Sequence, residues 1–254
     1  MKFFLLLILC FPSSIFADEI SMAFGESIPP FSFPETDTGI ELEVISEALA
    51  FHNHTLKPVY YPLARIPIAF TYKQVDAAMT DLGQDMHKLD AHYGNSAVVY
   101  NNVFISLKKN NFTISKPEDL EELSVISFQG AIKRYPLWLE PVKRVDKYFE
   151  QNNQLLQVLT LDREHYDVVL SDLSIYKYFA LQAESKSGKK MKEIQFHRFV
   201  ELDLDDYRPV FWSERIRDNF NEGLIDLKAT GRYQEIHDKY LKPTKKTPST
   251  LIRK

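Results

Sequence analysis

Cysteine is almost absent from this chain of 254 residues, because Cys10 is the only one. A single cysteine cannot form a disulfide within the chain, and it cannot supply a set of thiolate ligands for a metal. Cys10 also lies within the apolar leader described below, so a processed chain would contain no cysteine. The fold must therefore rest on burial of apolar side chains, and a chain of this length can bury enough of them.

A basic excess and a long internal apolar run are missing as well. The chain has 31 Lys and Arg residues against 35 Asp and Glu residues, which gives a formal net charge of −4. Because nucleic-acid-binding proteins normally carry an excess of positive charge, we expect no nucleic-acid partner. After residue 17, no apolar run approaches the roughly 20 residues that a membrane-spanning helix needs.

Common catalytic and metal-binding motifs are also missing. The chain has no Gly-x-Ser-x-Gly, no P-loop and no Gly-x-Gly-x-x-Gly. His52 and His54 are too close together for a metal-binding pair on a helix, and His87 and His92 have no cysteine partner. We therefore expect no metal, no cofactor and no enzymatic activity.

The first 17 residues have the pattern of a secretory signal peptide. Lys2 precedes the apolar run 3–10, and small residues lead to Ala17. We expect cleavage near Ala17 and a periplasmic location. Two alternatives stay open at this point: an uncleaved membrane anchor, and lipid attachment at Cys10, which the bulky Leu9 before it disfavours.

Strand and helix patterns alternate along the rest of the chain. In 39–51, for example, Ile40, Val44 and Ala48 belong to one apolar stripe of an amphipathic helix. The expected strands are 20–24, 56–61, 75–79, 97–107, 124–128, 167–170 and 196–200, and the expected helices are 39–51, 64–72, 142–151, 154–161, 173–183, 211–227 and 233–241. Such alternation predicts an α/β fold with largely parallel sheets that are covered by helices.

The same pattern predicts two units. One extended segment leaves the first unit near Ile105, and another re-enters it near Val200. We therefore expect residues 18–105 and 201–254 to form a discontinuous lobe 1, and residues 106–200 to form an inserted lobe 2, with a two-stranded hinge between them.

Six short segments in this order carry a resemblance to a known family. They are Pro30-Phe31-Ser-Phe33, Gly39-Ile40, Val75-Asp76-Ala77 with Met79-Thr80, Lys116-Pro117-Glu118-Asp-Leu120, Tyr166-Asp167-Val168-Val169 through Asp172, and Gly231 before Tyr240. Together they resemble the bacterial family 3 periplasmic solute-binding proteins, which deliver polar amino acids to ABC importers. The resemblance implies a two-lobed, type II periplasmic-binding-protein-like α/β fold that closes on a small-molecule ligand. It also implies a monomer whose partner is the membrane permease of an ABC transporter.

The chain departs from this family at one ligand-binding position. Amino-acid-binding members carry Thr-x-x-Glu-Arg after the Met-Thr strand, and that arginine grips the carboxylate of the ligand. Gln84 and Asp85 stand in these places here, so the ligand is expected to be amino-acid-like or related, without a closer assignment. Arg65 resembles an arginine that begins a cleft helix in divergent members, and its fork would suit an oxyanion. The alternative for Arg65 is a surface arginine at a helix start.

The other candidates for ligand contact follow from the resemblance and from their places at strand ends. Asp172 matches the aspartate that receives a ligand ammonium group, and it is equally suited to cap the helix that begins at Leu173. Phe31 is expected against the ligand or in the core. The remaining candidates are Glu26, Thr80, Asp81, Gln129, Gly130 and Arg134, of which the last three border a strand end where backbone N–H groups could bind an anion.

Two rival functions use the same fold. One is a ligand-sensing protein that acts on a membrane receptor instead of a permease. The other is a dehydratase-like enzyme, for which Glu26 or Asp172 is the available general acid.

Overall fold

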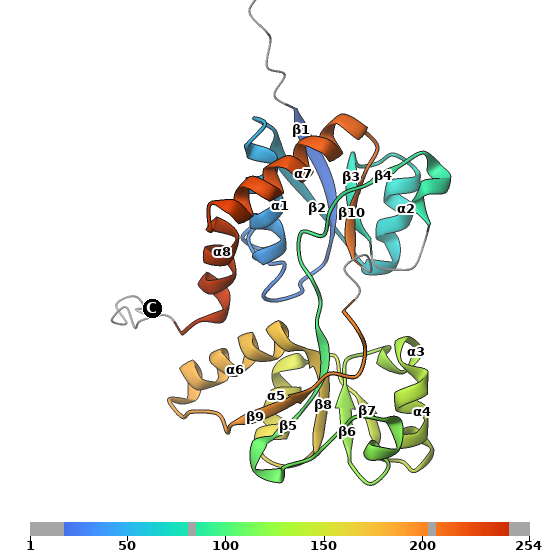
Figure 1. Cartoon of the computed structure of the whole chain (residues 1–254), viewed down its shortest axis with the longest axis vertical. Coiled ribbons are helices and arrows are strands. Elements are labelled where there is room, and N and C mark those ends of the chain that lie inside the picture. The colour runs from blue at the N-terminus through green and yellow to red at the C-terminus, as the bar shows by residue number, and fades with distance from the viewer. Residues whose placement is uncertain (1–17, 81–84, 203–206, 244–254) are drawn as a thin grey trace, which may run out of the picture.

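The computed structural model describes residues 18–80, 85–202 and 207–243, and in these residues the strands form two five-stranded sheets. Figure 1 shows two bodies, one above the other, each built around one sheet. We call the body that contains β1 lobe 1 and the body that contains β5 lobe 2. The α/β, two-lobed architecture predicted from the sequence is confirmed.

The sheet of lobe 1 has the order β2-β1-β3-β10-β4. Its strands are β1 (Glu19–Gly25), β2 (Thr55–Tyr61), β3 (Ala77–Thr80), β4 (His92–Tyr93) and β10 (Arg208–Phe211). Strand β1 is parallel to β2 and β3, whereas β10 is antiparallel to β3 and β4. The carboxyl ends of the three parallel strands therefore share one edge, which is the edge where open α/β sheets bind ligands.

Helices cover both faces of this sheet (Figure 1). The helices of lobe 1 are α1 (Ile40–Ala50), α2 (Ile66–Thr71), α7 (Glu214–Ala229) and α8 (Arg232–Leu241), with 3₁₀ turns η1 (Leu63–Arg65) and η2 (Met86–Leu89). Because side chains alternate along a strand, Met22 and Phe24 face the core under α1 and α7, and Ala23 faces the core under α2.

The sheet of lobe 2 has the order β7-β6-β8-β5-β9. Its strands are β5 (Asn102–Leu107), β6 (Val125–Ser127), β7 (Tyr148–Glu150), β8 (Val168–Asp172) and β9 (Ile194–His197). Its helices are α3 (Ala131–Arg134), α4 (Pro136–Arg144), α5 (Gln154–Asp162) and α6 (Leu173–Ser187), with 3₁₀ turns η3 (Lys108–Asn110) and η4 (Pro117–Leu120). Strands β6 and β8 are parallel, so Ser127 and the end of β8 lie at the edge that faces lobe 1.

The chain passes between the two sheets twice, between β4 and β5 and again between β9 and β10. The first passage comes earlier than the expected boundary near Ile105, because the whole of β5 pairs with β8 and β9 in lobe 2. Ile105 and its neighbours are buried on both faces of the strand. A strand of this kind carries no sequence signal that assigns it to one sheet or the other.

Several other local predictions were wrong. The helix expected at 142–151 ends at Arg144, and Tyr148–Glu150 form β7, which pairs with β6. Asp146 between them has a φ of 55°, which no helix accepts. The helix expected from residue 211 begins at Glu214 after the Ser213 N-cap, since Phe211 belongs to β10.

Other expected elements are shifted by a few residues. The strand expected at 97–107, for example, begins at Asn102 as β5. Helix α6 continues to Ser187, into the stretch 185–190 that was expected as a loop, and β9 ends at His197 instead of residue 200. Within the described residues, no helix combines the length and apolar character that a membrane crossing requires.

Candidate functional site

A pocket of about 220 Å³ lies between the two lobes. Its walls are aliphatic and aromatic side chains with a smaller number of polar groups. Lobe 1 and the first connection contribute Ile28, Leu63, Tyr100 and Tyr207, and lobe 2 contributes Asn102, Phe128, Arg134, Gln154, Ser171, Asp172 and Ile175. An apolar pocket with a few convergent polar groups is the usual form of a small-molecule site.

Asp172 is the most deeply buried charged group in this pocket, with 2% of its surface exposed. Its Oδ1 accepts hydrogen bonds from the backbone N–H groups of Ser174 and Ile175 at 2.8 and 2.9 Å, and thereby caps α6. Its Oδ2 accepts from the N–H of Asn101 at 2.6 Å. Burial raises the pKa of Asp172 to about 6, although these N–H groups act in the opposite direction. The side chain is thus both a helix cap and a part of the pocket wall.

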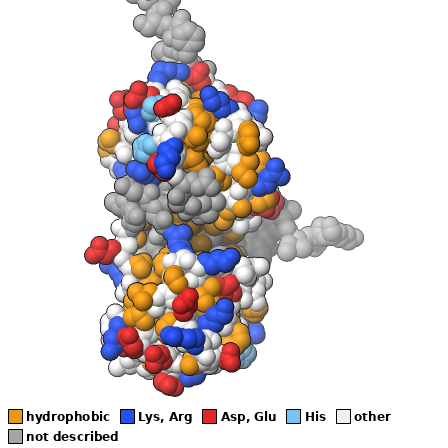
Figure 2. Space-filling model, turned by 90° about the vertical axis from the view of Figure 1, so that its right-hand side faces the viewer, with side chains coloured by type: hydrophobic (Ala, Val, Ile, Leu, Met, Phe, Trp, Pro, Cys, Tyr) orange, Lys and Arg blue, Asp and Glu red, His pale blue; other side chains and the backbone are white. Residues whose placement is uncertain are grey.

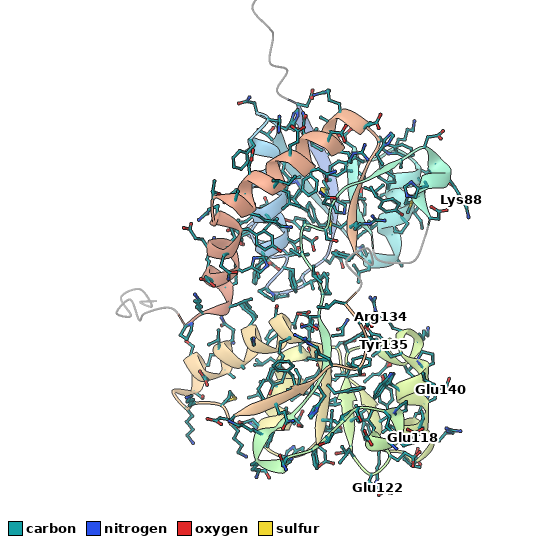
Figure 3. The ribbon with its side chains drawn as sticks, in the orientation of Figure 1. Lys88, Glu118, Glu122, Arg134, Tyr135 and Glu140 are labelled. Carbon is teal, nitrogen blue, oxygen red and sulfur yellow. The ribbon has the colours of Figure 1, made fainter. Side chains whose placement is uncertain are left out.

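Arg134 lines the same pocket from the short helix α3. The charged groups of opposite sign, Arg134 and Asp172, therefore both come from lobe 2. Figure 3 shows Arg134 at the end of lobe 2 that faces lobe 1. In the face shown in Figure 2, basic side chains also lie along the boundary between the two bodies.

Gln129 and Gly130 follow β6, where an anion site was expected. Gln129 is exposed. The N–H of Gly130 donates to Glu150 Oε2 at 3.0 Å, and the N–H of Ile132 donates to Glu150 Oε1 at 3.3 Å. Burial acts to raise the pKa of Glu150, but the N–H of Gly130 and the hydroxyl of Tyr148 outweigh it, so the pKa is lowered. A carboxylate of the protein itself thus binds these N–H groups.

Phe31 lies behind the pocket wall. It is 2% exposed and belongs to the core of lobe 1, and its ring lies 4.4 Å from that of Tyr100, which lines the pocket. Arg65 and Glu26 are both exposed and are not among the lining residues, although Leu63, two residues before Arg65, is.

The segment after β3 carries the remaining candidates. Thr80 is the last residue of β3 and pairs with Arg208. Asp81 and Gln84 lie outside the described residues. Asp85, at the position of the family arginine, accepts a hydrogen bond from the N–H of His87 at 3.1 Å and caps η2.

Glu41 is a buried acidic residue that the sequence analysis did not single out. The hydroxyl groups of Tyr100 and Tyr207 both donate to its carboxylate at 3.4 Å, so Glu41 ties two pocket-lining tyrosines to α1. The sequence did contain a signal for the burial of Glu41. Residue 41 lies three residues before Val44 and seven before Ala48, so it belongs to the same buried face of the helix. Asn102, Gln154 and Ser171 have no comparable signal.

The lobes also touch outside the pocket. Helix α6 lies on the side of lobe 2 that faces lobe 1 (Figure 1). Its Ile175 is 6% exposed and belongs to the core cluster of lobe 1, against which Phe179 also packs. The ring of Tyr178 lies 5.8 Å from that of Phe33, which stacks on Tyr240 at the same distance.

No family model matches this sequence, and no curated protein matches it either. Solved structures do match its fold. Substrate-binding domain 2 of Lactococcus lactis GlnP, in an open conformation, is 19% identical, with a TM-score of 0.64 over 92% of this chain and 98% of that chain. An ancestral cationic amino acid solute-binding protein is 16% identical, with a TM-score of 0.64 over 88% of this chain and 96% of that chain.

A sensor domain of a histidine kinase that is similar to periplasmic binding proteins also matches. It is 16% identical, with a TM-score of 0.59 over 88% of this chain and 97% of that chain. At these identities the comparisons describe the fold. The chain has the two-lobed α/β fold of the amino-acid-binding proteins of ABC transporters.

Proposed function

We propose that this protein captures a small polar solute, amino-acid-like or related, between lobe 1 and lobe 2 and closes around it. The observation that carries the proposal is the pocket between the lobes, which both lobes line and in which Arg134 and Asp172 supply opposite charges. The fold shared with solute-binding proteins supports the same function. Asp172 would receive a donor group of the solute, and Phe31 would support the wall behind Tyr100.

The proposal includes the setting in which binding takes place. We place the protein in the periplasm after removal of residues 1–17, as a monomer that binds no cofactor and delivers its solute to the permease of an ABC importer. We propose that residues 18–101 and 201–254 form lobe 1 and that the residues between them form lobe 2; the pairing of β5 with β8 supports this first boundary in place of the expected residue 105. We propose no catalytic role.

Sensing is the second candidate function, because a histidine kinase sensor domain has the same fold. Both functions need a ligand, but only transport makes solute uptake depend on this protein. Deleting the gene and measuring uptake of the identified solute separates the two. Unchanged uptake together with a lost transcriptional response would favour sensing.

A thermal-shift screen over amino acids, polyamines, organic acids and small peptides tests ligand capture. A ligand that binds only the folded protein stabilises it by about 2.7 kcal/mol at a hundredfold excess over its Kd. We expect at least one compound to raise the melting temperature, with a shift that grows with concentration. The absence of any shift across the four classes would contradict the proposal.

Closure predicts that a residue outside the pocket affects affinity. Replacing Tyr178 with alanine removes its ring contact with Phe33 between the lobes. An aromatic pair contributes about 0.5–1.5 kcal/mol, so we expect solute affinity measured by calorimetry to fall about three- to tenfold. Tyr166→Ala is the control, because Tyr166 is also half-buried and pairs with Phe149 inside lobe 2. Equal losses in both variants would argue against closure.

A further inference from the structure

We infer that Arg134 is the anion-binding group of the pocket and that Tyr135 and Asn102 position it, so that a carboxylate or similar oxyanion of the solute docks on lobe 2. This inference rests on the proposed function, since it names which end of the solute is recognised and by which residues. In the family pattern, the arginine that binds the ligand carboxylate stands at another position, which Asp85 occupies in this chain.

Two hydrogen bonds meet at the hydroxyl oxygen of Tyr135. Arg134 donates to it from Nε at 3.1 Å, and Asn102 donates to it from Nδ2 at 3.0 Å. The Arg134 guanidinium also lies 5.8 Å from the centre of the Tyr135 ring. A hydroxyl oxygen has two lone pairs, so these two N–H groups use its acceptor capacity. The Tyr135 oxygen thus holds the Nε end of the guanidinium.

Tyr135 is itself held in place by the interior of lobe 2. Its ring meets Phe199 edge-on at 4.9 Å, and Phe199 packs against Phe104 at 4.4 Å and Trp138 at 5.3 Å. Phe104 lies in the middle of β5 and is fully buried. One hydrogen bond of the exposed Arg134 side chain thus ends on a tyrosine that packs against the core of lobe 2.

Asn102 is held by the sheet. It is the first residue of β5 and pairs in register with Asp172 of β8. Asn102, Arg134 and Asp172 all line the pocket. Figure 3 shows Arg134 and Tyr135 next to each other at the end of lobe 2 that faces lobe 1. The cation and the carboxylate of the pocket therefore stand on one rigid frame.

Arg134 fits the anion role better than Arg65. Both side chains are exposed, but Arg134 lines the pocket and donates to Tyr135, whereas Arg65 is not among the lining residues. A planar guanidinium binds a carboxylate with two parallel N–H bonds, which gives direction as well as attraction. With the anion on Arg134 and a donor group near Asp172, the solute would occupy lobe 2 first, and lobe 1 would then cover it with Tyr100 and Tyr207.

Calorimetric titration of the full chain with the twenty common L-amino acids and with their α-carboxamides tests this inference. The amide keeps the side chain and amino group but has no anionic carboxylate. We expect the wild-type protein to bind at least one acid about 10- to 100-fold more tightly than its amide. Arg134→Gln should lower affinity for that acid by a similar factor and leave affinity for the amide within about twofold. Arg134→Lys should recover only part of the loss, because an ammonium group has no fork.

Tyr135→Phe separates positioning from structure. It removes the oxygen that holds Arg134 and leaves the ring in the aromatic cluster. We expect about a tenfold fall in affinity for the acid, little change for the amide, and no further fall when Tyr135→Phe is added to Arg134→Gln. Tyr60→Phe is the matched control, since it removes another hydrogen-bonded tyrosine hydroxyl at a residue outside the pocket lining. It should leave the ratio of acid to amide affinity unchanged, as should Arg65→Gln.

The outcomes that overturn the inference differ from those that overturn the proposed function. An amide that binds as tightly as its acid, or an Arg134→Gln protein with wild-type affinity, overturns the anion role and leaves solute capture intact. Equal losses for acid and amide in Tyr135→Phe overturn the positioning role of Tyr135. If neither acids nor amides bind and the wider screen also fails, the proposed function is wrong and this inference with it.

Discussion

Replacing Gly223 with alanine is expected to lower the free energy of unfolding by about 3 kcal/mol or more. Gly223 lies on α7 where this helix crosses α1. A Cβ at this position would lie 1.9 Å from the carbonyl oxygen of Ala48 and 2.8 Å from its carbonyl carbon. Both atoms are helix backbone and cannot swing aside, so the two helices would have to separate. Urea denaturation of the purified variant measures the loss.

Helix propensity alone predicts the opposite result, a Gly223→Ala protein that is more stable than the wild type. Alanine in the middle of a helix is normally more stable than glycine by roughly 0.5–1 kcal/mol. Gly188→Ala is the control, because Gly188 ends α6 with a φ of 68° and has nothing within 4 Å of an added Cβ. That variant should lose only about 1–2 kcal/mol, from backbone strain alone. A Gly223→Ala protein as stable as Gly188→Ala would show that α1 and α7 do not pack this closely.

Local patterns were sufficient to predict the elements that build the core. The apolar stripe of α1 and the buried runs of β1 and β8 appear in the structure within one or two residues of the expected bounds. These elements are recognisable because each presents its own periodicity to one core. The two-lobed division followed from their order, since two α/β runs are separated by extended segments.

Strands that depend on distant partners were missed. Strand β10 (Arg208–Phe211) contains Pro209, which usually argues against a strand that has neighbours on both sides. Pro209 pairs with Met79 of β3, and on the other side its carbonyl accepts a hydrogen bond from the N–H of Gly94, one residue past the end of β4. No local pattern contains this information, because the partners lie more than 100 residues away in the chain.

The candidate site also combines residues with a local signal and residues without one. Asp172 and Arg134 were visible because they follow strand ends, where ligand-binding residues gather. Tyr135 and Asn102 were not, since neither occupies a position that predicts a hydrogen bond with the other. Their meeting depends on the packing of Tyr135 against Phe199, which comes from a distant segment of the chain. Positioning residues of this kind become visible only once the tertiary contacts are known.

Replacing Asp172 with alanine is expected to cost about 3 kcal/mol and to abolish solute binding. The change removes the N-cap of α6, which is worth about 1 kcal/mol. It also leaves the N–H of Asn101 without its carboxylate partner, at a cost of about 1–3 kcal/mol. Asn101 lies between the pocket-lining residues Tyr100 and Asn102, so its release would disturb both walls. Asp172→Asn is the control for the loss of the helix cap, because an amide oxygen can still accept the hydrogen bonds that begin α6. Wild-type binding by Asp172→Ala would remove this residue from the site.

The pH dependence of stability separates the charge of Asp172 from its shape. Burial raises its pKa from an ordinary 3.8 to about 6. Between these values the folded protein holds the proton more tightly than the unfolded chain does. The free energy of unfolding should therefore fall by up to about 3 kcal/mol as pH rises from 4 to 6, and then level off.

Asp172→Asn removes this titrating group and keeps all the others. Subtracting the free energy of unfolding of the variant from that of the wild type at each pH therefore isolates the contribution of Asp172. A difference that stays flat from pH 4 to 7 would mean that the pKa of Asp172 is not raised, and a difference that rises with pH below pH 4 would mean that the backbone N–H groups outweigh burial. A solute whose ammonium group binds against Asp172 would favour the ionised carboxylate. Saturation with that solute should then flatten the slope between pH 4 and 6, because the bound cation supplies the charge compensation that burial removes.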